Sequence, residues 1–291
     1  MTSLWSKIKD SWRGLKKIRR LLEWDDLQMQ NRLLKTEIDR LRASLEELKR
    51  HAETEWDLAL DGPGAGTFDD FYYAFEEKFR GSRELVKSRL AIYLPYVERA
   101  RGLNAAGGFL DIGCGRGEWL ELLKENNVAC RGIDLNQRMI DETRARGLES
   151  ERADALAFLR KMPDESLSGI SGFHIIEHLP FAALMTLLAE ARRTLAPGGV
   201  LILETPNPEN FIVGSCNFYV DPTHRRPILP VALGFMLSQA GFKEHECLQV
   251  SLPDYLGGTD GVPASGVLRS LAEHMTVGQD YAMIAFKPQA G

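Results

Sequence analysis

The chain has 291 residues, 44% hydrophobic and 26% charged, which are the proportions of a folded globular protein and exclude a largely disordered chain. Its formal net charge of −5 at pH 7 argues against a nucleic-acid partner. No run of about 18 apolar residues and no secretory signal are present, so neither a membrane-spanning helix nor export is expected. The four cysteines form no C-x-x-C pair, which favours a reducing, cytoplasmic setting over a zinc site or disulfides.

Residues 1–22 predict a basic amphipathic helix. This segment holds seven lysines and arginines against a single acid, and its apolar side chains recur at helical spacing. Trp5 and Trp12 on the apolar face suit the surface of an anionic membrane, where each cation contributes about 1 kcal/mol to binding. The same pattern suits docking on a protein, and Gly14 weakens an isolated helix. Contact with the inner face of the cytoplasmic membrane and docking on a protein are both predicted alternatives.

Residues 23–60 predict a coiled coil. One set of heptad positions is leucine throughout, at Leu27, Leu34, Leu41 and Leu48. The other set holds Trp24, Asn31, Ile38, Leu45 and Ala52. Asn31 followed by Ile38 favours a parallel, in-register pair, so we expect a homo-oligomer whose chain number stays open. An antiparallel helix packed on the rest of the chain is the alternative.

Residues 61–67 are rich in glycine and predict a flexible connection to a domain over 68–291. Helices are expected up to residue 101, and after that short apolar stretches alternate with amphipathic helical ones, which predicts a mostly parallel sheet covered on both faces. Seven strands are expected, at 109–112, 129–134, 148–152, 169–176, 200–204, 243–250 and 281–287. The predicted fold class is therefore α/β, a doubly wound seven-stranded Rossmann-like sheet preceded by an N-terminal coiled-coil helix. The long connections at 206–230 and 252–278 are expected to shape the substrate side.

A glycine-rich turn follows the first predicted strand, with Gly113, Gly115 and Gly117 at alternate positions and a helix at 118–124 behind them. Such a turn lets the backbone approach a nucleoside cofactor, and the helix N-terminus favours a carboxylate group. Glu118 stands where a nicotinamide-binding turn usually has glycine or alanine, and its charge would face a pyrophosphate. This disfavours a dehydrogenase acting on nucleotide sugars and favours a cofactor without phosphate.

Three carboxylates are expected at the carboxyl ends of successive strands. Asp111 could accept a hydrogen bond from an ammonium group of the cofactor or order the turn, and Asp134 stands about 20 residues after the turn, where a carboxylate binds ribose hydroxyls. Asp154, followed by Ala155, could accept from the adenine amino group. Each acid taken alone could instead be a helix N-cap, but their order favours a cofactor site.

These residues resemble the fingerprint of class I S-adenosylmethionine-dependent methyltransferases, over residues 68–291. Within that class, five segments are similar to the methyltransferase domain of bacterial enzymes that terminate O-antigen chains. They are 71–82, 111–120, 173–180, 204–210 and 221–227, with sequences that include DIGCGRGEWL, FHIIEHLP, ETPNPEN and DPTHRRP. The resemblance implies a Rossmann-like methyltransferase fold and S-adenosylmethionine as the cofactor. It also implies a role in lipopolysaccharide biosynthesis, with Arg80 as a clamp for the cofactor carboxylate, unless Arg80 only pairs with Glu76 or Glu77.

The resemblance further implies the acceptor. Members of that family methylate the terminal sugar of a growing, lipid-linked glycan, or a phosphate placed on it, and they use a coiled coil and a membrane-associating segment. No kinase segment follows here, so a sugar hydroxyl is favoured over a phosphate. A peripheral membrane location and a glycosyltransferase partner are expected. The alternatives are a scaffold with a vestigial cofactor fold that recruits glycosyltransferases, and an O-methyltransferase acting on a small molecule such as a quinone precursor.

The reacting end is expected where the fourth strand ends. Glu177 and His178 lie there, and His178 is the candidate general base, because a sugar hydroxyl must lose its proton and histidine titrates near neutral pH. A packed histidine without a catalytic role is the alternative. His224, after Asp221, is expected to line the acceptor pocket. The spacing of His174, Glu177 and His178, with His224 later, is similar to the divalent-ion ligands of quinone-pathway and small-RNA O-methyltransferases, although His174 replaces a glutamate. A divalent cation is therefore a second option, and catalysis by proximity of the two substrates alone is a third.

Overall fold

The computed structural model describes residues 35–36, 38–40, 42–44, 65–103, 107–252 and 266–289. It divides into two compact units, Met1–Phe68 and Asp69–Gly291. The described residues between 35 and 44 are helical, while the predicted basic helix and most of the predicted coiled coil lie outside the described residues. Helix α2 (Ala65–Phe79) includes the last three residues of the connection predicted at 61–67.

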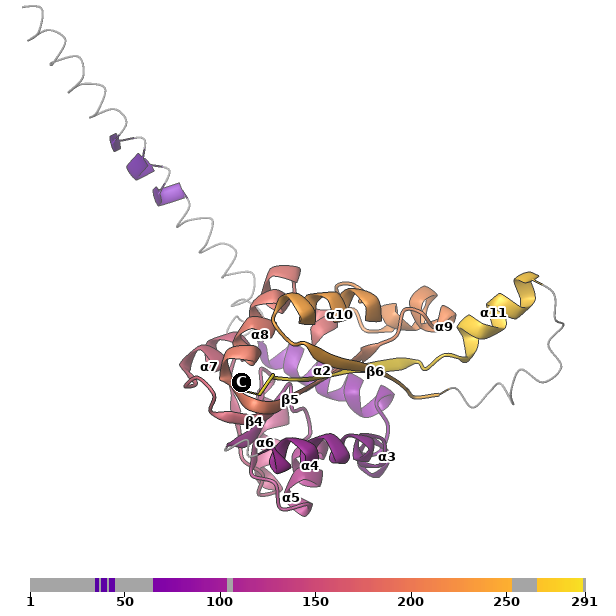
Figure 1. The fold of residues 1–291 in the computed structure, drawn as a ribbon, viewed down its shortest axis with the longest axis horizontal. Helices are drawn as coiled ribbons and strands as arrows, with labels where there is room; N and C mark the ends of the chain where they lie inside the picture. Colours follow the sequence, from indigo (N-terminus) through magenta and orange to yellow (C-terminus); the bar gives the residue numbers. More distant parts are fainter. Residues whose placement is uncertain are drawn as a thin grey trace, which may run out of the picture. The chain divides into compact units, whose positions relative to one another are not determined.

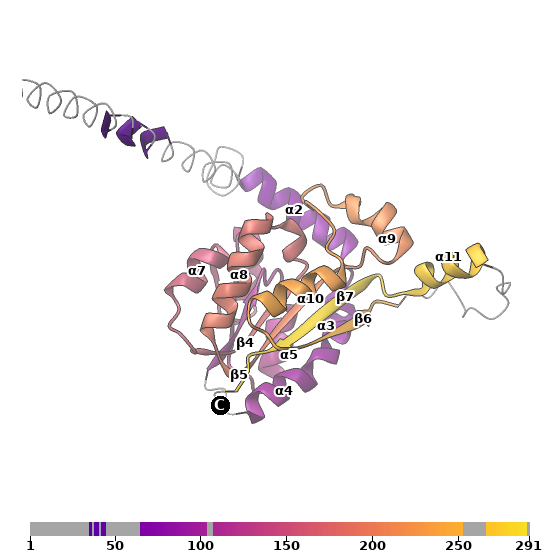
Figure 2. The same ribbon diagram turned by 45° about the horizontal axis from the view of Figure 1, so that its top comes forward.

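The second unit is built on a seven-stranded sheet of order β3-β2-β1-β4-β5-β7-β6. The strands are β1 (Gly108–Ile112), β2 (Cys130–Asp134), β3 (Ser150–Arg152), β4 (Leu167–Phe173), β5 (Leu195–Pro206), β6 (Glu244–Val250) and β7 (Asp280–Phe286). Neighbouring strands pair in parallel, except that β7 is antiparallel to both β5 and β6. The predicted doubly wound, mostly parallel sheet is confirmed, and its layers are visible in Figures 1 and 2.

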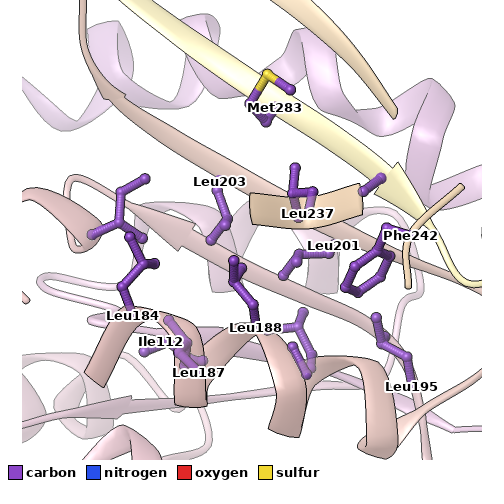
Figure 3. Close-up of a cluster of buried hydrophobic side chains, with 14 of the residues drawn as sticks. Ile112, Leu184, Leu187, Leu188, Leu195, Leu201, Leu203, Leu237, Phe242 and Met283 are labelled. Atoms are coloured by element: carbon purple, nitrogen blue, oxygen red, sulfur yellow. The ribbon is translucent and has the colours of Figure 1, made fainter. Parts of the chain in front are cut away.

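Helices cover both faces of this sheet. One face carries α7 (Ala155–Lys161), α8 (Phe181–Thr194) and α10 (Pro230–Gln239), and the other carries α3 (Arg83–Leu90), α4 (Leu94–Gly102) and α5 (Glu118–Glu125). α6 (Gln137–Ala145) packs beside β2 and β3. The side chains of a strand alternate between the two cores: Leu201 and Leu203 join the α8 side, shown in Figure 3, whereas Val200 and Ile202 join the α4 side. Strands buried on both faces need continuous apolar runs, and the sequence supplies them.

Two strands, β4 and β5, differ most from the prediction. β4 ends at Phe173 instead of residue 176, because His174 has a positive φ of 57° and leaves the extended conformation. A short 3₁₀ turn, η2 (Ile176–His178), follows. β5 is longer than expected and carries the sheet onward to Pro206, opposite Asp280 of β7.

Both long connections contribute structure near the carboxyl ends of the strands. The first holds α9 (Phe211–Ser215) and η3 (Asn217–Val220), and the second holds α11 (Gly266–Thr276), which contacts α9. The side chain of Asn210 caps α9 and donates to the carbonyl of Val277 at 2.8 Å, which ties the two connections together. Among the described residues, no helix is long and apolar enough to cross a bilayer.

Candidate active site

The glycine turn after β1 has the backbone that glycine allows. Gly113, Gly115 and Gly117 have φ values of 68°, 50° and 81°, all in the left-handed region. A Cβ at Gly113 would lie 1.9 Å from the Ile175 side chain, and one at Gly117 would lie 2.9 Å from Thr143 of α6. The Thr143 hydroxyl also donates to the Gly115 carbonyl at 2.9 Å. The conformation therefore favours glycine at all three positions, and close packing adds to this at Gly113 and Gly117, as predicted for a cofactor turn.

Two of the three predicted carboxylates lie beside this turn: Asp111 is fully buried, and Asp134 is partly buried. Asp134 Oδ2 accepts from the Gly115 N–H at 2.9 Å, and its Oδ1 accepts from the Asn136 N–H at 2.8 Å. Asp111 accepts from the Ser171 hydroxyl at 2.7 Å. Burial raises the pKa of Asp134 to about 6 and the pKa of Asp111 to about 7. Such carboxylates favour a cationic or hydroxyl-rich ligand beside them.

The third carboxylate, Asp154, is a helix N-cap, which was the alternative to the predicted contact with adenine. It is the N-cap of α7, and its Oδ1 accepts from the Ala157 N–H at 2.8 Å. Ala155 is the first residue of that helix. Asp154 still lies where β3 ends, at the same edge of the sheet as Asp134. Capping and contact with an adenine remain compatible, because a carboxylate accepts several hydrogen bonds.

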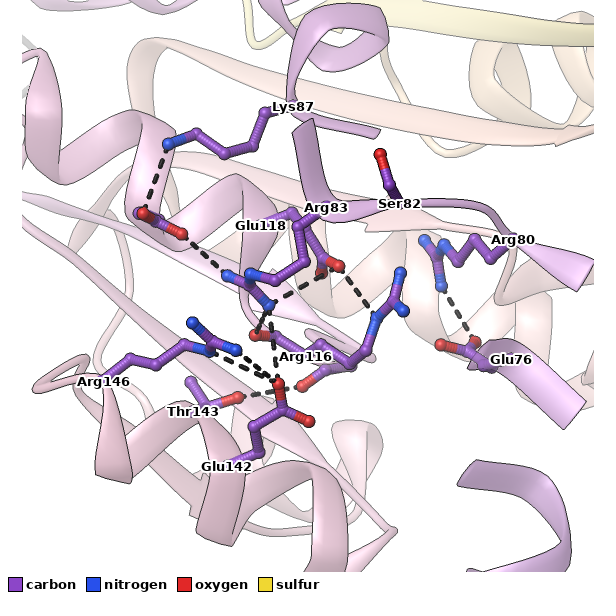
Figure 4. A network of polar contacts seen from close by, with 12 residues as sticks. Glu76, Arg80, Ser82, Arg83, Lys87, Arg116, Glu118, Glu142, Thr143 and Arg146 are labelled. Atoms are coloured by element: carbon purple, nitrogen blue, oxygen red, sulfur yellow. Dashed lines mark hydrogen bonds and ion pairs between the residues drawn. The ribbon is translucent and has the colours of Figure 1, made fainter. Parts of the chain in front are cut away.

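Glu118 lies in a buried ionic network, so the prediction that its charge would repel a pyrophosphate needs a correction. Its carboxylate pairs with Arg116 at 2.9 Å and with Arg83 at 3.6 Å (Figure 4). Arg83 also pairs with Glu121 at 2.7 Å. The charge of Glu118 is thus compensated by two guanidinium groups. The expectation that it would repel a pyrophosphate is therefore weak, and this residue alone does not exclude a nicotinamide cofactor.

Glu76 of α2 and Arg80, which directly follows α2, cover the glycine turn. The two pair at 2.9 Å, as the alternative interpretation of Arg80 required (Figure 4). A Cβ at Gly115 would lie 3.5 Å from Glu76 Oε2 and 3.8 Å from Arg80 Nη1. Glu76 Oε2 is buried without a hydrogen-bond partner, and Glu76 also raises the pKa of Asp134. A hydroxyl or ammonium donor between Glu76 and Asp134 would satisfy both carboxylates.

A cavity of about 300 Å³ extends from Arg80 and Glu76 to the carboxyl ends of β4, β5 and the start of β7. Its lining includes aromatic side chains of α2, three histidines and three carboxylates. These are Tyr72, Phe75, Phe79, His174, His178, His224, Glu76, Asp221 and Asp280. Cavities that bind small molecules have volumes of about 300–1,000 Å³, so this one suits a single ring-sized group. The predicted catalytic histidines are brought together beside the predicted cofactor turn.

His174 is clamped between two carboxylates at the floor of this cavity. Its Nδ1 lies 3.3 Å from Glu177 Oε1, and its Nε2 lies 3.3 Å from Glu204 Oε1. Burial alone would lower the pKa of His174, but the two carboxylates outweigh burial and raise it well above the usual value. Ligand atoms of His174, Glu204 and Asp280 lie within 4.8 Å of one another, so His174 as a metal ligand stays a prediction, with partners other than His178 and His224.

His178 is the base candidate that the structure favours. Its Nδ1 lies 2.9 Å from the Thr223 hydroxyl, and its ring is 4.8 Å, between centroids, from the ring of His224. Burial lowers the pKa of His178, so the ring is neutral at neutral pH. Glu177 lies below it, fully buried, and accepts from the Thr205 hydroxyl at 2.8 Å. Burial would raise the pKa of Glu177, but its contact with His174 outweighs burial and lowers it.

His224 faces acidic atoms. Its Nδ1 lies 2.6 Å from the Phe218 carbonyl, which can only accept, so Nδ1 carries the hydrogen. Its Nε2 lies 3.8 Å from Glu177 Oε1 and 3.8 Å from Asp221 Oδ2. Ligand atoms of Glu177, His178 and His224 lie within 4.8 Å of one another, so these three residues could hold a divalent cation.

Sequence reasoning missed four residues of this site. Tyr93 donates to Glu204, whose carboxylate also contacts His174, and Asp280 enters the cavity because β7 pairs with β5. Thr223 contacts His178 from a loop 45 residues away in sequence. Glu204 and Thr223 stood within segments that carry the family resemblance, at 204–210 and 221–227, but no role was predicted for either. The other contacts depend on strand register and on the packing of a helix, which no local pattern reveals.

The sheet order, the antiparallel β7 and the glycine turn together define the class I fold of S-adenosylmethionine-dependent methyltransferases. The crystal structure of a methyltransferase of this kind from Archaeoglobus fulgidus has 35% sequence identity and a TM-score of 0.67, and covers 75% of this chain and 100% of its own. A protein of Mycolicibacterium smegmatis named as an S-adenosylmethionine-dependent methyltransferase is 32% identical over 160 residues, which are 55% of this chain and 59% of that protein. A ubiquinone biosynthesis O-methyltransferase of Xanthomonas oryzae pv. oryzae is 29% identical over 121 residues, 40% of this chain and 49% of that one.

Residues 83–246 match the family model described as a methyltransferase domain, which is more than half of the chain. The chain therefore belongs to the methyltransferase domain family. The match with these two curated relatives spans 59% and 49% of their lengths. The predicted enzyme class and the predicted cofactor, S-adenosylmethionine, are confirmed at the level of the family, whereas the acceptor is a matter for proposal.

Proposed function

We propose that this protein transfers a methyl group from S-adenosylmethionine to a hydroxyl group of the terminal sugar of a bacterial surface glycan such as O-antigen. The observation that carries the proposal is the position of His178, a neutral histidine in the wall of a cavity that reaches the cofactor turn through Arg80 and Glu76. A neutral imidazole can act as a general base for a hydroxyl acceptor, because the hydroxyl must lose its proton as it attacks.

The walls of the cavity support a sugar hydroxyl over a phosphate. Asp221, Asp280 and Glu76 accept hydrogen bonds from hydroxyl groups, and together they oppose an anionic phosphate despite Arg80 and Arg89. The aromatic side chains of α2 add an apolar wall, with Phe75 and Phe79 rings 4.6 Å apart between centroids. A sugar ring has hydroxyls on its edge and apolar C–H faces, so it matches both kinds of wall.

In the proposed reaction, the cofactor supplies a methyl group activated by a positively charged sulfur. Asp134 and Glu76 would accept from its ribose hydroxyls or ammonium group, and Arg80 would pair with its carboxylate. His178 Nε2 takes the proton of the acceptor hydroxyl, and the oxygen forms the new bond to the methyl carbon as the bond to sulfur breaks. Glu177, ionised beneath the histidines, stabilises the positive charge that His178 acquires.

Two further proposals concern residues that lie mostly outside the described ones. We propose that residues 23–60 form a homo-oligomeric coiled coil and that residues 1–22 bind the inner face of the cytoplasmic membrane or a glycosyltransferase. Such an arm would hold the cavity near a lipid-linked glycan. These proposals rest on the heptad and on the basic amphipathic pattern.

Transfer of labelled methyl groups to a purified lipid-linked oligosaccharide tests the proposal. The full chain should label the glycan, and His178→Gln should lower the rate about 10²–10⁴-fold, the usual contribution of a general base, while binding S-adenosylmethionine with unchanged affinity. Labelling of a quinone precursor instead would replace the substrate, in line with the ubiquinone-pathway relative. An intact chain that binds no S-adenosylmethionine would support the scaffold alternative.

A divalent cation is the second candidate for activation of the hydroxyl. Glu177, His178 and His224 would hold it, and it would lower the pKa of a bound hydroxyl. Activity lost in a chelator and restored by a divalent ion would establish this role. Activity unchanged in the chelator would leave His178 as the base.

A further inference from the structure

A threonine in the loop after η3 lies between the candidate base and a carboxylate. The Thr223 hydroxyl oxygen is 2.9 Å from His178 Nδ1 and 2.6 Å from Asp221 Oδ1. The backbone N–H of Thr223 donates to the same Oδ1 at 2.7 Å, which holds the loop closed around the carboxylate. Asp221 is nearly buried, and its Oδ2 accepts from the Tyr72 hydroxyl of α2 at 3.3 Å.

These contacts fix the direction of the hydrogen bonds. Asp221 Oδ1 already accepts the Thr223 N–H, so the short contact with the hydroxyl is a second bond that it accepts. A threonine hydroxyl has a single hydrogen, so its oxygen can offer only a lone pair to His178. His178 Nδ1 must therefore carry a hydrogen and donate it.

We propose that Thr223 is a positioning residue: its hydroxyl links His178 to Asp221 and so holds the His178 ring in the Nδ1–H tautomer. This inference rests on the proposed function, because the tautomer leaves the lone pair on Nε2, the nitrogen that takes the acceptor's proton. Neutral histidine in water prefers the opposite tautomer, with the hydrogen on Nε2, and that tautomer would have no lone pair there. The hydrogen bond at the other nitrogen decides which form is present.

The surroundings of His178 agree with this assignment. His224 turns its own Nδ1 to the Phe218 carbonyl, so it does not compete for Thr223. His178 lies beside Tyr72 with ring centroids 6.4 Å apart and near-perpendicular planes, and Tyr72 donates to Asp221. The helix that covers the cavity thus also anchors the carboxylate at the end of the relay.

Nitrogen-15 NMR of the full chain labelled at histidine tests the inference without any acceptor. The two ring nitrogens of a neutral histidine have well-separated shifts, and the signals of His178 are identified by their loss in His178→Gln. We expect a protonated Nδ1 and an unprotonated Nε2 in the wild type. Thr223→Val, which keeps the shape and removes the hydroxyl, should move His178 towards the Nε2–H form, and Thr223→Ser should restore the wild-type signals.

Activity with the lipid-linked oligosaccharide gives the second readout. Thr223→Val should lower turnover by about tenfold or more with unchanged affinity for S-adenosylmethionine, and Thr223→Ser should recover most of it. If Thr223→Val fails to fold, Thr223→Ala serves in its place, and the wild-type spectrum still decides. A wild-type His178 with its hydrogen on Nε2, or Ser and Val variants that are equally impaired, would overturn the inference. If His178 has the Nδ1–H form but the wild type transfers no methyl group to the oligosaccharide, the proposed function is contradicted and the inference about Thr223 is not.

Discussion

At the scale of single residues, the site contains side chains that serve the fold and the chemistry together. Asp154 is the plainest case, since it caps α7 where a contact with adenine was also predicted. The two roles have different consequences. A cap contributes about 1 kcal/mol to stability, and a cofactor contact contributes only when the cofactor is bound.

Substitution of Asp154 separates these roles. Asp154→Ser keeps a side chain that caps helices well but is too short to reach a base, so the melting temperature should change little while the Kd for S-adenosylmethionine rises about tenfold. Asp154→Asn is the control, because it keeps both the cap and an accepting oxygen. Calorimetry and thermal unfolding measure the two effects. Unchanged affinity in Asp154→Ser would reduce Asp154 to a helix cap.

The buried carboxylates predict a proton release on cofactor binding. The pKa of Asp111 is raised to about 7, so much of this carboxyl is protonated at pH 6.5. A cationic ligand lowers the pKa of a nearby acid, so the proton should leave as S-adenosylmethionine binds. Binding heats at pH 6.5 should therefore differ between buffers of different ionisation enthalpy, and the difference should shrink in Asp111→Asn to the smaller release from Asp134, whose pKa of about 6 leaves it mostly ionised at that pH. Equal heats for the wild type in both buffers would mean that no cation approaches Asp111.

At the level of helices and strands, the end of the glycine turn packs the start of α5 against α6. Gly117 has a positive φ of 81°, and a Cβ there would lie 2.9 Å from Thr143 and 3.0 Å from Leu148. Gly147 has a similar φ of 72°, but a Cβ there would meet only Lys124 Nζ, at 4.0 Å. The two glycines therefore share backbone strain and differ in packing.

This pair predicts two different losses of stability. Gly147→Ala should lower the free energy of unfolding by about 1–2 kcal/mol, the cost of a left-handed conformation. Gly117→Ala should lower it by a further 1–3 kcal/mol or so, because the new methyl group also crowds the helix interface. Denaturant unfolding measures both. Equal losses would show that α6 moves aside and that close packing does not explain Gly117.

The elements also show how far the sequence could predict this protein. The turn, the strands and the helix behind Gly113 follow from local spacing and apolar periodicity, so their positions agree with the structure to within a few residues. The clamp on His174 could not be predicted in the same way. It needs the register that sets Glu204 beside Ala282 and the packing that brings Tyr93 of η1 (Ala91–Tyr93) onto β5. The extended strand predicted through residue 176 failed because His174 adopts a positive φ.

At the scale of the whole molecule, the proposed arm predicts self-association. Leu41 is at a core position of the predicted heptad, and Ala43, two residues later, is at an outer position and exposed. Leu41→Lys should convert the oligomer to a monomer in light scattering, because a charge in the seam cannot be desolvated. Ala43→Lys should leave the mass unchanged. An unchanged oligomer in Leu41→Lys would locate the interface elsewhere, and a monomeric wild type would contradict the coiled coil itself.

The central claim is that one edge of the sheet binds S-adenosylmethionine so that its reactive sulfur opens towards the cavity containing His178. A crystal structure of the full chain with S-adenosylhomocysteine tests this claim most directly. We expect the ribose at Asp134, the carboxylate at Arg80, and the sulfur at the cavity, with room for one sugar ring between the sulfur and His178. A sulfur that faces away from His178, or a ligand that fills the space between the two, would contradict the account.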